Sequence, residues 1–120
     1  MRSEWIEYKG KKIFYQNFSK NFYNSEAVRA ELAEVQEIVK AQPLHSALVL
    51  SDFRDTNVGS DVLSDMNAAS AATKAHVHKT AVLGVTGMKR RLADLLTAIT
   101  GQPLKYFDDI ESAKNWLAED

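Results

Sequence analysis

Ala47-Leu48-Val49-Leu50 and Ala81-Val82-Leu83-Gly84-Val85 are the longest strongly apolar runs in the 120-residue chain. Each run is short and bounded by polar residues, which is typical of a strand that is buried on both faces. Between them, a helix capped by Ser60 is predicted, because several side chains recur at helical spacing on one face: Val62, Met66, Ala69 and Thr73. A strand–helix–strand unit predicts a right-handed crossover between parallel strands.

The N-terminal segment predicts an antiparallel hairpin. Residues 5–8 and 12–16 are rich in aromatic and β-branched side chains, and they flank Lys9-Gly10, where glycine allows the positive φ of a tight turn. From Ser25 to about Ala41, apolar residues recur at three- and four-residue spacing, which predicts an amphipathic helix.

The C-terminal part continues the alternation of strands and helices. A helix with Met88 to Ile99 at its core-facing positions is expected after the second apolar run, followed by a strand at 104–107. Asp108 and Glu111 have capping-box spacing before a last helix. We expect one α/β domain over residues 1–120, with a four- to five-stranded, mostly parallel sheet, an N-terminal antiparallel hairpin and about four helices. The hairpin leaves an open sheet edge, at which we expect a second copy to pair as a homodimer.

Composition narrows the classes of function. The net charge is −1, so the chain lacks the overall field that draws nucleic acid to a protein. It has no cysteine, which excludes disulfides, thiolate catalysis and thiolate metal sites. No apolar run is long enough to span a bilayer, and the residues from Met1 to Trp5 lack a signal-peptide core. We therefore expect a cytoplasmic protein, and no residue pattern predicts a cofactor.

A binding site is expected at the carboxyl edge of the sheet, because ligands of open α/β sheets bind in the crevice beyond the strand ends. The loop at 51–59 is rich in polar groups that suit a partner or ligand, namely Asp52, Arg54, Asp55 and Asn57. Thr56 and Ser60 are candidate phosphorylation sites, since a phosphate there would change the local charge. Capping of the following helix is an alternative role for Ser60.

A second loop at this edge joins a strand to a helix through Thr86-Gly87, followed by Lys89 and Arg90. Cations at the start of a helix are disfavoured by the helix dipole by about 0.3–1 kcal/mol each. An anionic ligand, an acidic partner, or Asp52 or Asp55 would compensate them, although solvated basic side chains explain the pattern equally well. The segment is no P-loop, because the GxxxxGK[ST] spacing is absent.

Two further groups of residues have alternative interpretations. His76 and His78 would share one face at the start of a strand, as two metal ligands do, but the adjacent Lys79 opposes a cation and favours surface histidines. Five aromatic residues around the hairpin predict core packing, with an apolar ligand groove as the alternative: Phe14, Tyr15, Phe18, Phe22 and Tyr23. With no GxSxG motif, and with the Asp108-Asp109 pair explained by capping, we expect no enzyme.

The order of elements, together with residues 48–52, residues 76–84 and Phe107-Asp108-Asp109 ahead of residues 113–117, resembles the STAS family. The similarity is greatest to its SpoIIAA-like branch of small bacterial proteins and covers nearly the whole chain. It implies a regulatory, protein-interaction domain of the anti-sigma-factor-antagonist type, whose partner is a kinase or another signalling component. Such domains are switched by phosphorylation of a serine at the start of the helix after the strand that here ends at Asp52.

The region that matches this serine reads Asp55-Thr56-Asn57-Val58-Gly59-Ser60, without the Asp-Ser-Ser-Gly signature of the family. The resemblance therefore makes Ser60 a candidate by position alone. The SpoIIAA-like branch is also similar in fold to CRAL-TRIO lipid-transfer domains. That similarity implies the alternative function, binding of a small apolar or anionic molecule or of a lipid.

Overall fold

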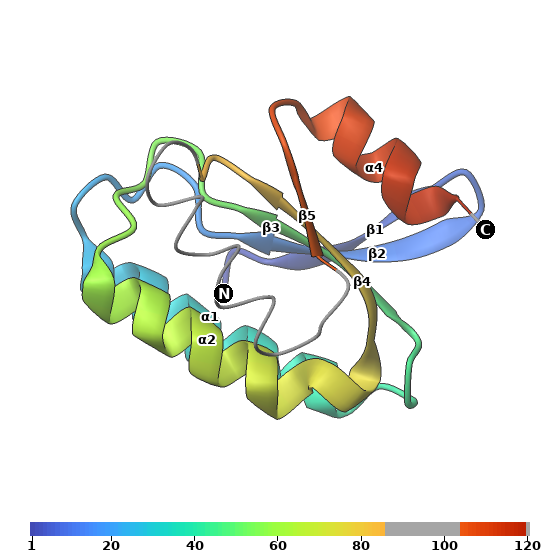
Figure 1. The fold of residues 1–120 in the computed structure, drawn as a ribbon, viewed down its shortest axis with the longest axis horizontal. Helices are drawn as coiled ribbons and strands as arrows, with labels where there is room; N and C mark the ends of the chain where they lie inside the picture. The colour runs from blue at the N-terminus through green and yellow to red at the C-terminus, as the bar shows by residue number, and fades with distance from the viewer. Residues whose placement is uncertain (86–103, 120) are drawn as a thin grey trace.

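Five strands form one sheet in the computed structural model, which describes residues 1–85 and 104–119 (Figure 1). The strands are neighbours in chain order: β1 (Glu4–Tyr8), β2 (Lys11–Asn17), β3 (Ala47–Asp52), β4 (Val77–Leu83) and β5 (Leu104–Phe107). β1 pairs antiparallel with β2, whereas β2 to β5 pair in parallel. The α/β class, the hairpin and the mostly parallel sheet are therefore confirmed.

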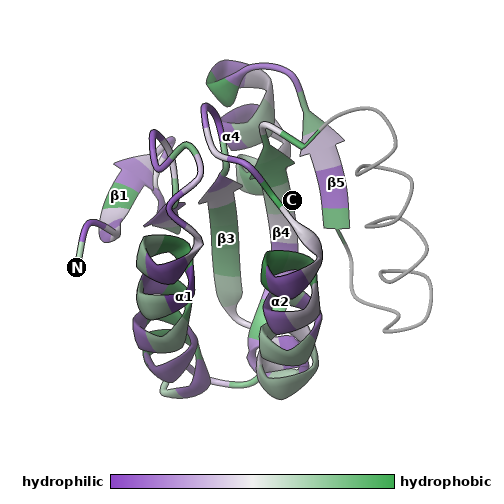
Figure 2. Ribbon diagram, turned by 90° about the vertical axis from the view of Figure 1, so that its left-hand side faces the viewer, coloured by the Kyte–Doolittle hydropathy of each residue, from purple (hydrophilic) through white to green (hydrophobic). Residues whose placement is uncertain are grey.

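Helices cover both faces of this sheet. α1 (Ser25–Lys40) and α2 (Ser60–Thr73) stand side by side on one face, and α4 (Ile110–Ala118) covers the other (Figures 1 and 2). A single 3₁₀ turn, Lys74–His76, leads from α2 into β4. The described residues thus contain three α-helices, and the helix expected over 88–99 lies outside them.

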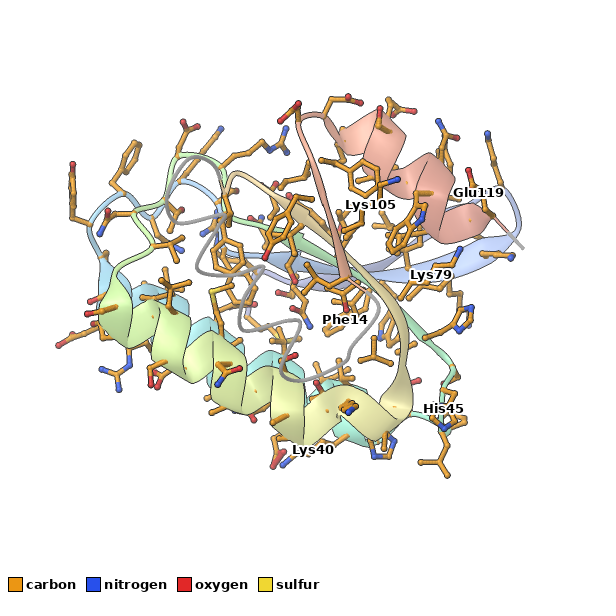
Figure 3. All side chains as sticks on the ribbon, in the orientation of Figure 1. Phe14, Lys40, His45, Lys79, Lys105 and Glu119 are labelled. Carbon is orange, nitrogen blue, oxygen red and sulfur yellow. The ribbon has the colours of Figure 1, made fainter. Side chains whose placement is uncertain are left out.

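The strands divide the core into two layers because successive side chains point to opposite faces. Every residue of β3 is buried. Val49 packs with Phe14, labelled in Figure 3, in the layer under α1 and α2, whereas Leu48 and Leu50 pack with Leu117 of α4. This burial on both faces explains the uninterrupted apolar run of the sequence.

The N-terminus is fixed to α1 by a buried carboxylate. Glu31 accepts hydrogen bonds from the Ser3 hydroxyl at 2.6 Å and the Ser3 amide at 2.9 Å. The Arg2 amide donates to both of its carboxylate oxygens at 3.1 Å. Burial opposes the charge of Glu31, but these hydrogen bonds outweigh it and lower the pKa of the carboxyl group.

β4 begins at Val77, four residues before the apolar run at 81–85 that predicted this strand, and it includes His78 and Lys79. The hydrogen bonds of Lys79 show how a charged residue is tolerated in this strand. Its Nζ donates to the carbonyl oxygens of Trp116 and Glu119, each at 2.9 Å, and thereby satisfies two acceptors at the C-terminal end of α4 (Figure 3).

Two predicted helix caps are wrong by one residue. The residue that precedes α2 is Gly59, which makes no side-chain capping bond, so Ser60 is the first helical residue and not the cap. α4 is capped by Asp109 and not by Asp108, because Asp109 accepts from the Ser112 amide at 2.8 Å. In both places neighbouring polar residues make the position of the cap ambiguous in sequence.

Among the described residues, no helix is long and apolar enough to cross a membrane.

Candidate functional site

Two loops meet at the carboxyl edge of the sheet, one following β2 and one following β3. They lie side by side at the left of Figure 1 and are joined through their backbones. The amides of Phe18, Lys20 and Phe22 donate to the carbonyls of Asp52, Arg54 and Asp55 at 3.0, 2.9 and 2.9 Å. The Asn57 amide donates back to the carbonyl of Phe22 at 2.6 Å. The β2–β3 pairing thus continues past the end of both strands and holds the two loops as one unit.

Thr56 links the same two loops through its side chain. Its hydroxyl donates to the Phe18 carbonyl at 2.6 Å and accepts from the Asn21 amide at 3.1 Å. A phosphate on this oxygen would break both contacts. Thr56 therefore has a structural role, and of the two candidate phosphorylation sites only Ser60 is exposed.

A buried carboxylate lies where β3 ends. Asp52 accepts four hydrogen bonds: from the Tyr15 hydroxyl at 2.6 Å, from the Arg54 amide at 3.0 Å, and from Arg54 Nε and Nη2 at 3.0 and 2.7 Å. Its side chain is completely buried, whereas that of Arg54 is 45% exposed. Arg54 therefore neutralises Asp52 from the solvent side.

The pKa values at this cluster follow from its geometry. Burial alone would raise the pKa of Asp52, but the hydrogen bonds from Arg54 and Tyr15 outweigh it and lower that pKa. Burial raises the pKa of Tyr15, and the bond to Asp52 raises it further. The bond to Asp52 likewise raises the pKa of Arg54. At neutral pH the cluster is an ion pair with a neutral phenol, and Asp52 is a poor general base.

Gly84 brings the end of β4 against this cluster. It has a φ of +84°, and an added Cβ would lie 2.4 Å from the Arg54 amide nitrogen and 2.5 Å from the Phe53 carbonyl carbon. The Phe53 amide donates to the Leu83 carbonyl at 2.9 Å, so β4 also supports the loop that follows β3. Only glycine allows this close approach.

Phe22 and Tyr23 are exposed, which corrects the prediction that they belong to the core. Their exposed fractions are 63% and 86%, whereas Phe18 is buried and stacks on Phe53 with the ring centroids 4.7 Å apart. Positive φ values at Lys20, Phe22 and Asp55 (57°, 51° and 55°) bend the two loops at this point. Such strained backbone is concentrated at functional sites.

The structure brings together only part of the predicted site. Arg54, Asp55 and Asn57 are exposed on the loop that is hydrogen-bonded to the one bearing Phe22 and Tyr23, and Ser60 is exposed at the start of α2. Asp52 is buried and acts through Arg54. The predicted binding residues of the second loop lie outside the described residues: Thr86, Gly87, Lys89 and Arg90.

The alternative in which His76 and His78 share one strand face does not apply to the structure. His76 lies in the 3₁₀ turn, where its Nδ1 is 2.8 Å from the Gln42 carbonyl oxygen, and His78 lies on β4. They therefore do not share a strand face.

A cavity of about 90 Å³ lies between the sheet and the α1–α2 layer. Its walls are largely apolar and include Leu32 and Met66, but Gln16, Ser51 and Thr80 on the sheet also line it. The Ser51 hydroxyl donates to the Gln16 side-chain oxygen at 2.9 Å. An apolar space of this size, with a few polar groups on one wall, suits part of a small uncharged molecule.

Sequence reasoning missed Tyr15 as a partner of Asp52 and missed the exposure of Phe22 and Tyr23. A usable signal for the Tyr15–Asp52 contact was present in the sequence. Adjacent residues of a strand point to opposite faces, so Tyr15 lies on the face opposite to Phe14, and Asp52 lies on that same face. For the exposure of Phe22 and Tyr23 the sequence offers only a weak signal, namely their position in a polar connection.

No protein-family model matches the chain, and no curated protein or solved structure matches it significantly.

Proposed function

We propose that this chain is a regulatory protein-binding domain of the STAS type, and that it recognises its partner through the carboxyl edge of the sheet. The proposed surface, here called the aromatic edge, consists of Phe22, Tyr23, Arg54, Asp55 and Asn57. The observation that carries the proposal is the pair of neighbouring aromatic side chains that are 63% and 86% exposed.

Exposed aromatic side chains are the most productive contacts available to an interface. Burying a Phe side chain completely is worth about 1.5–3 kcal/mol. Tyr and Arg are enriched among the residues that contribute most to protein binding. The aromatic edge combines both kinds of residue, since Arg54 lies on the loop that is hydrogen-bonded to the one bearing Phe22 and Tyr23.

The aromatic edge is also ordered before a partner arrives. Backbone hydrogen bonds join its two loops, and the Asp52 carboxylate holds the Arg54 guanidinium. Ordering loops and side chains during association reduces affinity, so a surface that is already fixed retains more of its contact energy.

Ser60 is the residue at which phosphorylation would regulate this surface. It is exposed and begins α2, directly after the loop that carries Asp55 and Asn57. The positive end of the α2 dipole favours an added phosphate at this position, while the new negative charge changes what the aromatic edge attracts.

Site-specific photo-crosslinking tests the proposal. A photoreactive phenylalanine analogue replaces Tyr23 in one variant and Leu44 in the control, because Leu44 is 66% exposed and lies at the opposite edge, beside the His45 labelled in Figure 3. We expect one specific adduct with a different protein from position 23 and no adduct with a different protein from position 44. The partner so identified should bind the Tyr23→Ala variant at least about tenfold more weakly. Equal labelling from the two positions would contradict the proposal.

The second candidate function is binding of a small uncharged molecule, and the cavity lined by Gln16, Ser51 and Thr80 favours it. Native mass spectrometry of the purified chain would then show a ligand adduct. The Thr80→Val variant keeps the shape of the side chain and removes its hydroxyl, so it should retain less of that ligand. A mass without adduct, and no thermal shift with a panel of short-chain alcohols and amides, would exclude this function.

A further inference from the structure

Among the described strands, β1 lies at the edge of the sheet, and one row of its backbone groups has no described strand as a partner. Lys9 and Gly10 form a two-residue turn with φ values of 50° and 80°, and the Tyr8–Lys11 pair closes it. In such a hairpin the closing pair is hydrogen-bonded and the pairs alternate from there. Ile6 and Tyr8 therefore bond to β2, and the N–H and C=O groups of Trp5 and Glu7 point away from the sheet.

An independent observation agrees with this assignment. The Phe18 amide, which continues β2, donates to the Asp52 carbonyl on the β3 side. Backbone direction alternates along a strand, so the even-numbered residues of β2 bond to β3 and the odd-numbered ones to β1. The odd-numbered residues Ile13 and Tyr15 pair with Ile6 and Glu4, which again leaves Trp5 and Glu7 facing outward.

The residues of β1 are complementary to a second β1 in one antiparallel register. When Ile6 faces Ile6 of the second copy, Trp5 faces Glu7 and Glu4 faces Tyr8. Neither glutamate then faces another glutamate, an arrangement that would be destabilising. The outward groups of Trp5 and Glu7 fall opposite one another, so they complete four backbone hydrogen bonds about the two-fold axis.

Side chains beside β1 favour the same partner. Trp5 is 41% exposed and stacks on Phe14 with its ring centroid 4.8 Å away. A groove of about 610 Å³ lies next to it and is lined by Glu7, Lys12, Pro43 and other residues. In the register centred on Ile6, the indole of the second copy lies beside Glu7 at the rim of this groove.

We propose that the chain forms a two-fold symmetric homodimer in which β1 pairs antiparallel with β1 of a second copy, centred on Ile6. The pairing joins two five-stranded sheets into one continuous sheet. It removes an open edge that would otherwise invite unspecific strand addition. It also leaves the aromatic edge unused, so the two surfaces can be tested separately.

Sedimentation equilibrium of the intact chain tests the dimer first. From about 1 μM to about 1 mM, the average mass should rise from that of one chain towards that of two. A monomer mass over the whole range would overturn the proposal.

Disulfide trapping then tests the register, and the absence of cysteine from the chain makes single-cysteine variants unambiguous. Ile6→Cys should form a crosslinked dimer on mild oxidation, because directly facing residues in a non-hydrogen-bonded pair have Cα atoms about 4.5 Å apart. Glu4→Cys lies on the same strand face, but in this register its two copies are about 13 Å apart, too far for a disulfide. We expect crosslinking at position 6 to be at least about tenfold faster than at position 4.

Two further measurements keep the register testable if Ile6→Cys folds poorly. A mixture of Glu4→Cys and Tyr8→Cys chains should crosslink to each other, whereas neither variant should crosslink alone. Trp5→Lys and Trp5→Glu lose the same aromatic ring but place opposite charges across from Glu7. The Trp5→Glu variant should therefore dimerise at least about tenfold more weakly than the Trp5→Lys variant. Crosslinking at position 4 alone, or equal dimer affinity of the two Trp5 variants, would overturn the register.

Discussion

The Arg54 guanidinium holds the completely buried Asp52 carboxylate through two side-chain hydrogen bonds, from Nε at 3.0 Å and from Nη2 at 2.7 Å. Arg54→Ala would leave that carboxylate with only the Tyr15 hydroxyl and one amide. We expect the free energy of unfolding to fall by about 2–4 kcal/mol, because loss of one partner of a buried ion pair leaves an uncompensated charge. Urea unfolding followed by circular dichroism measures the change.

The control for this prediction is Arg29→Ala. Arg29 forms an ion pair with Asp65 on the surface, between α1 and α2. Exposed pairs contribute little, so this variant should be nearly as stable as the parent chain. Equal destabilisation by the two alanine variants would contradict the role assigned to Asp52.

Acid should destabilise the fold through Glu31 and Asp52. Hydrogen bonds lower the pKa of both carboxyl groups in the folded state. A group with a lowered folded-state pKa stabilises the protein above its unfolded pKa, about 4, and loses that contribution as the pH falls through the folded value. Stability should therefore decrease below about pH 4, and Glu31→Gln should make the decrease shallower. Urea midpoints from pH 2 to pH 7 measure it.

Glu37→Gln is the matched control on the same helix, because Glu37 is exposed and pairs with Lys40 at the surface. Its midpoints should follow those of the parent chain across the whole pH range. If Glu31→Gln follows them equally closely, the contacts of Glu31 with Ser3 and Arg2 do not contribute to acid sensitivity.

Gly84→Ala should destabilise the chain more than Gly10→Ala. Both glycines have positive φ, but an added Cβ at Gly84 would collide with the backbone of Phe53 and Arg54, whereas at Gly10 it would meet nothing within 4 Å. We expect a loss of about 1 kcal/mol at position 10 from the backbone conformation alone, and about 3 kcal/mol or more at position 84. Thermal melting of the two variants side by side gives the comparison, and a similar loss in both would show that the contact relaxes freely.

Thr56→Val should loosen the two loops of the aromatic edge. The substitution preserves the branched shape but removes the hydroxyl that bonds to the Phe18 carbonyl and the Asn21 amide. A loss of about 1–2 kcal/mol is expected, while Thr56→Ser should retain most of the stability. Hydrogen exchange of the Asn21 and Phe22 amides reports on the loops directly, and unchanged protection in Thr56→Val would contradict the prediction.

The predicted α/β class and mostly parallel sheet agreed with the structure because they depended on periodicity and on runs of apolar residues. β3 and α1 are both visible in sequence, since burial on two faces or on one helical stripe leaves a clear pattern. The start of β4 was missed because Lys79 is tolerated there only through its bonds to Trp116 and Glu119, which are far away in the chain. Contacts of this kind leave no local pattern.

The candidate site was predicted less well, for a related reason. The topology rule located the edge and its loop, including Arg54 and Asp55. Hydrophobicity then predicted burial for Phe22 and Tyr23, but backbone pairing between the loops, with positive φ at Phe22, holds these residues at the surface. The pairing between the two loops is made by main-chain groups, which every residue has. The types of residue in these loops therefore gave no sign of it.

The continued pairing of the two loops also has an evolutionary consequence. Because main-chain bonds fix Phe22 and Asp55 in position, the frame of the aromatic edge tolerates any side chains at these residues that accept their positive φ. Selection can therefore exchange them to follow a changing partner while the loops keep their shape. Thr56 and Gly84 lack this freedom, since the frame itself requires a hydroxyl at one and the absence of a side chain at the other. Divergent copies of this chain should accordingly vary in what they recognise before they vary in how they fold.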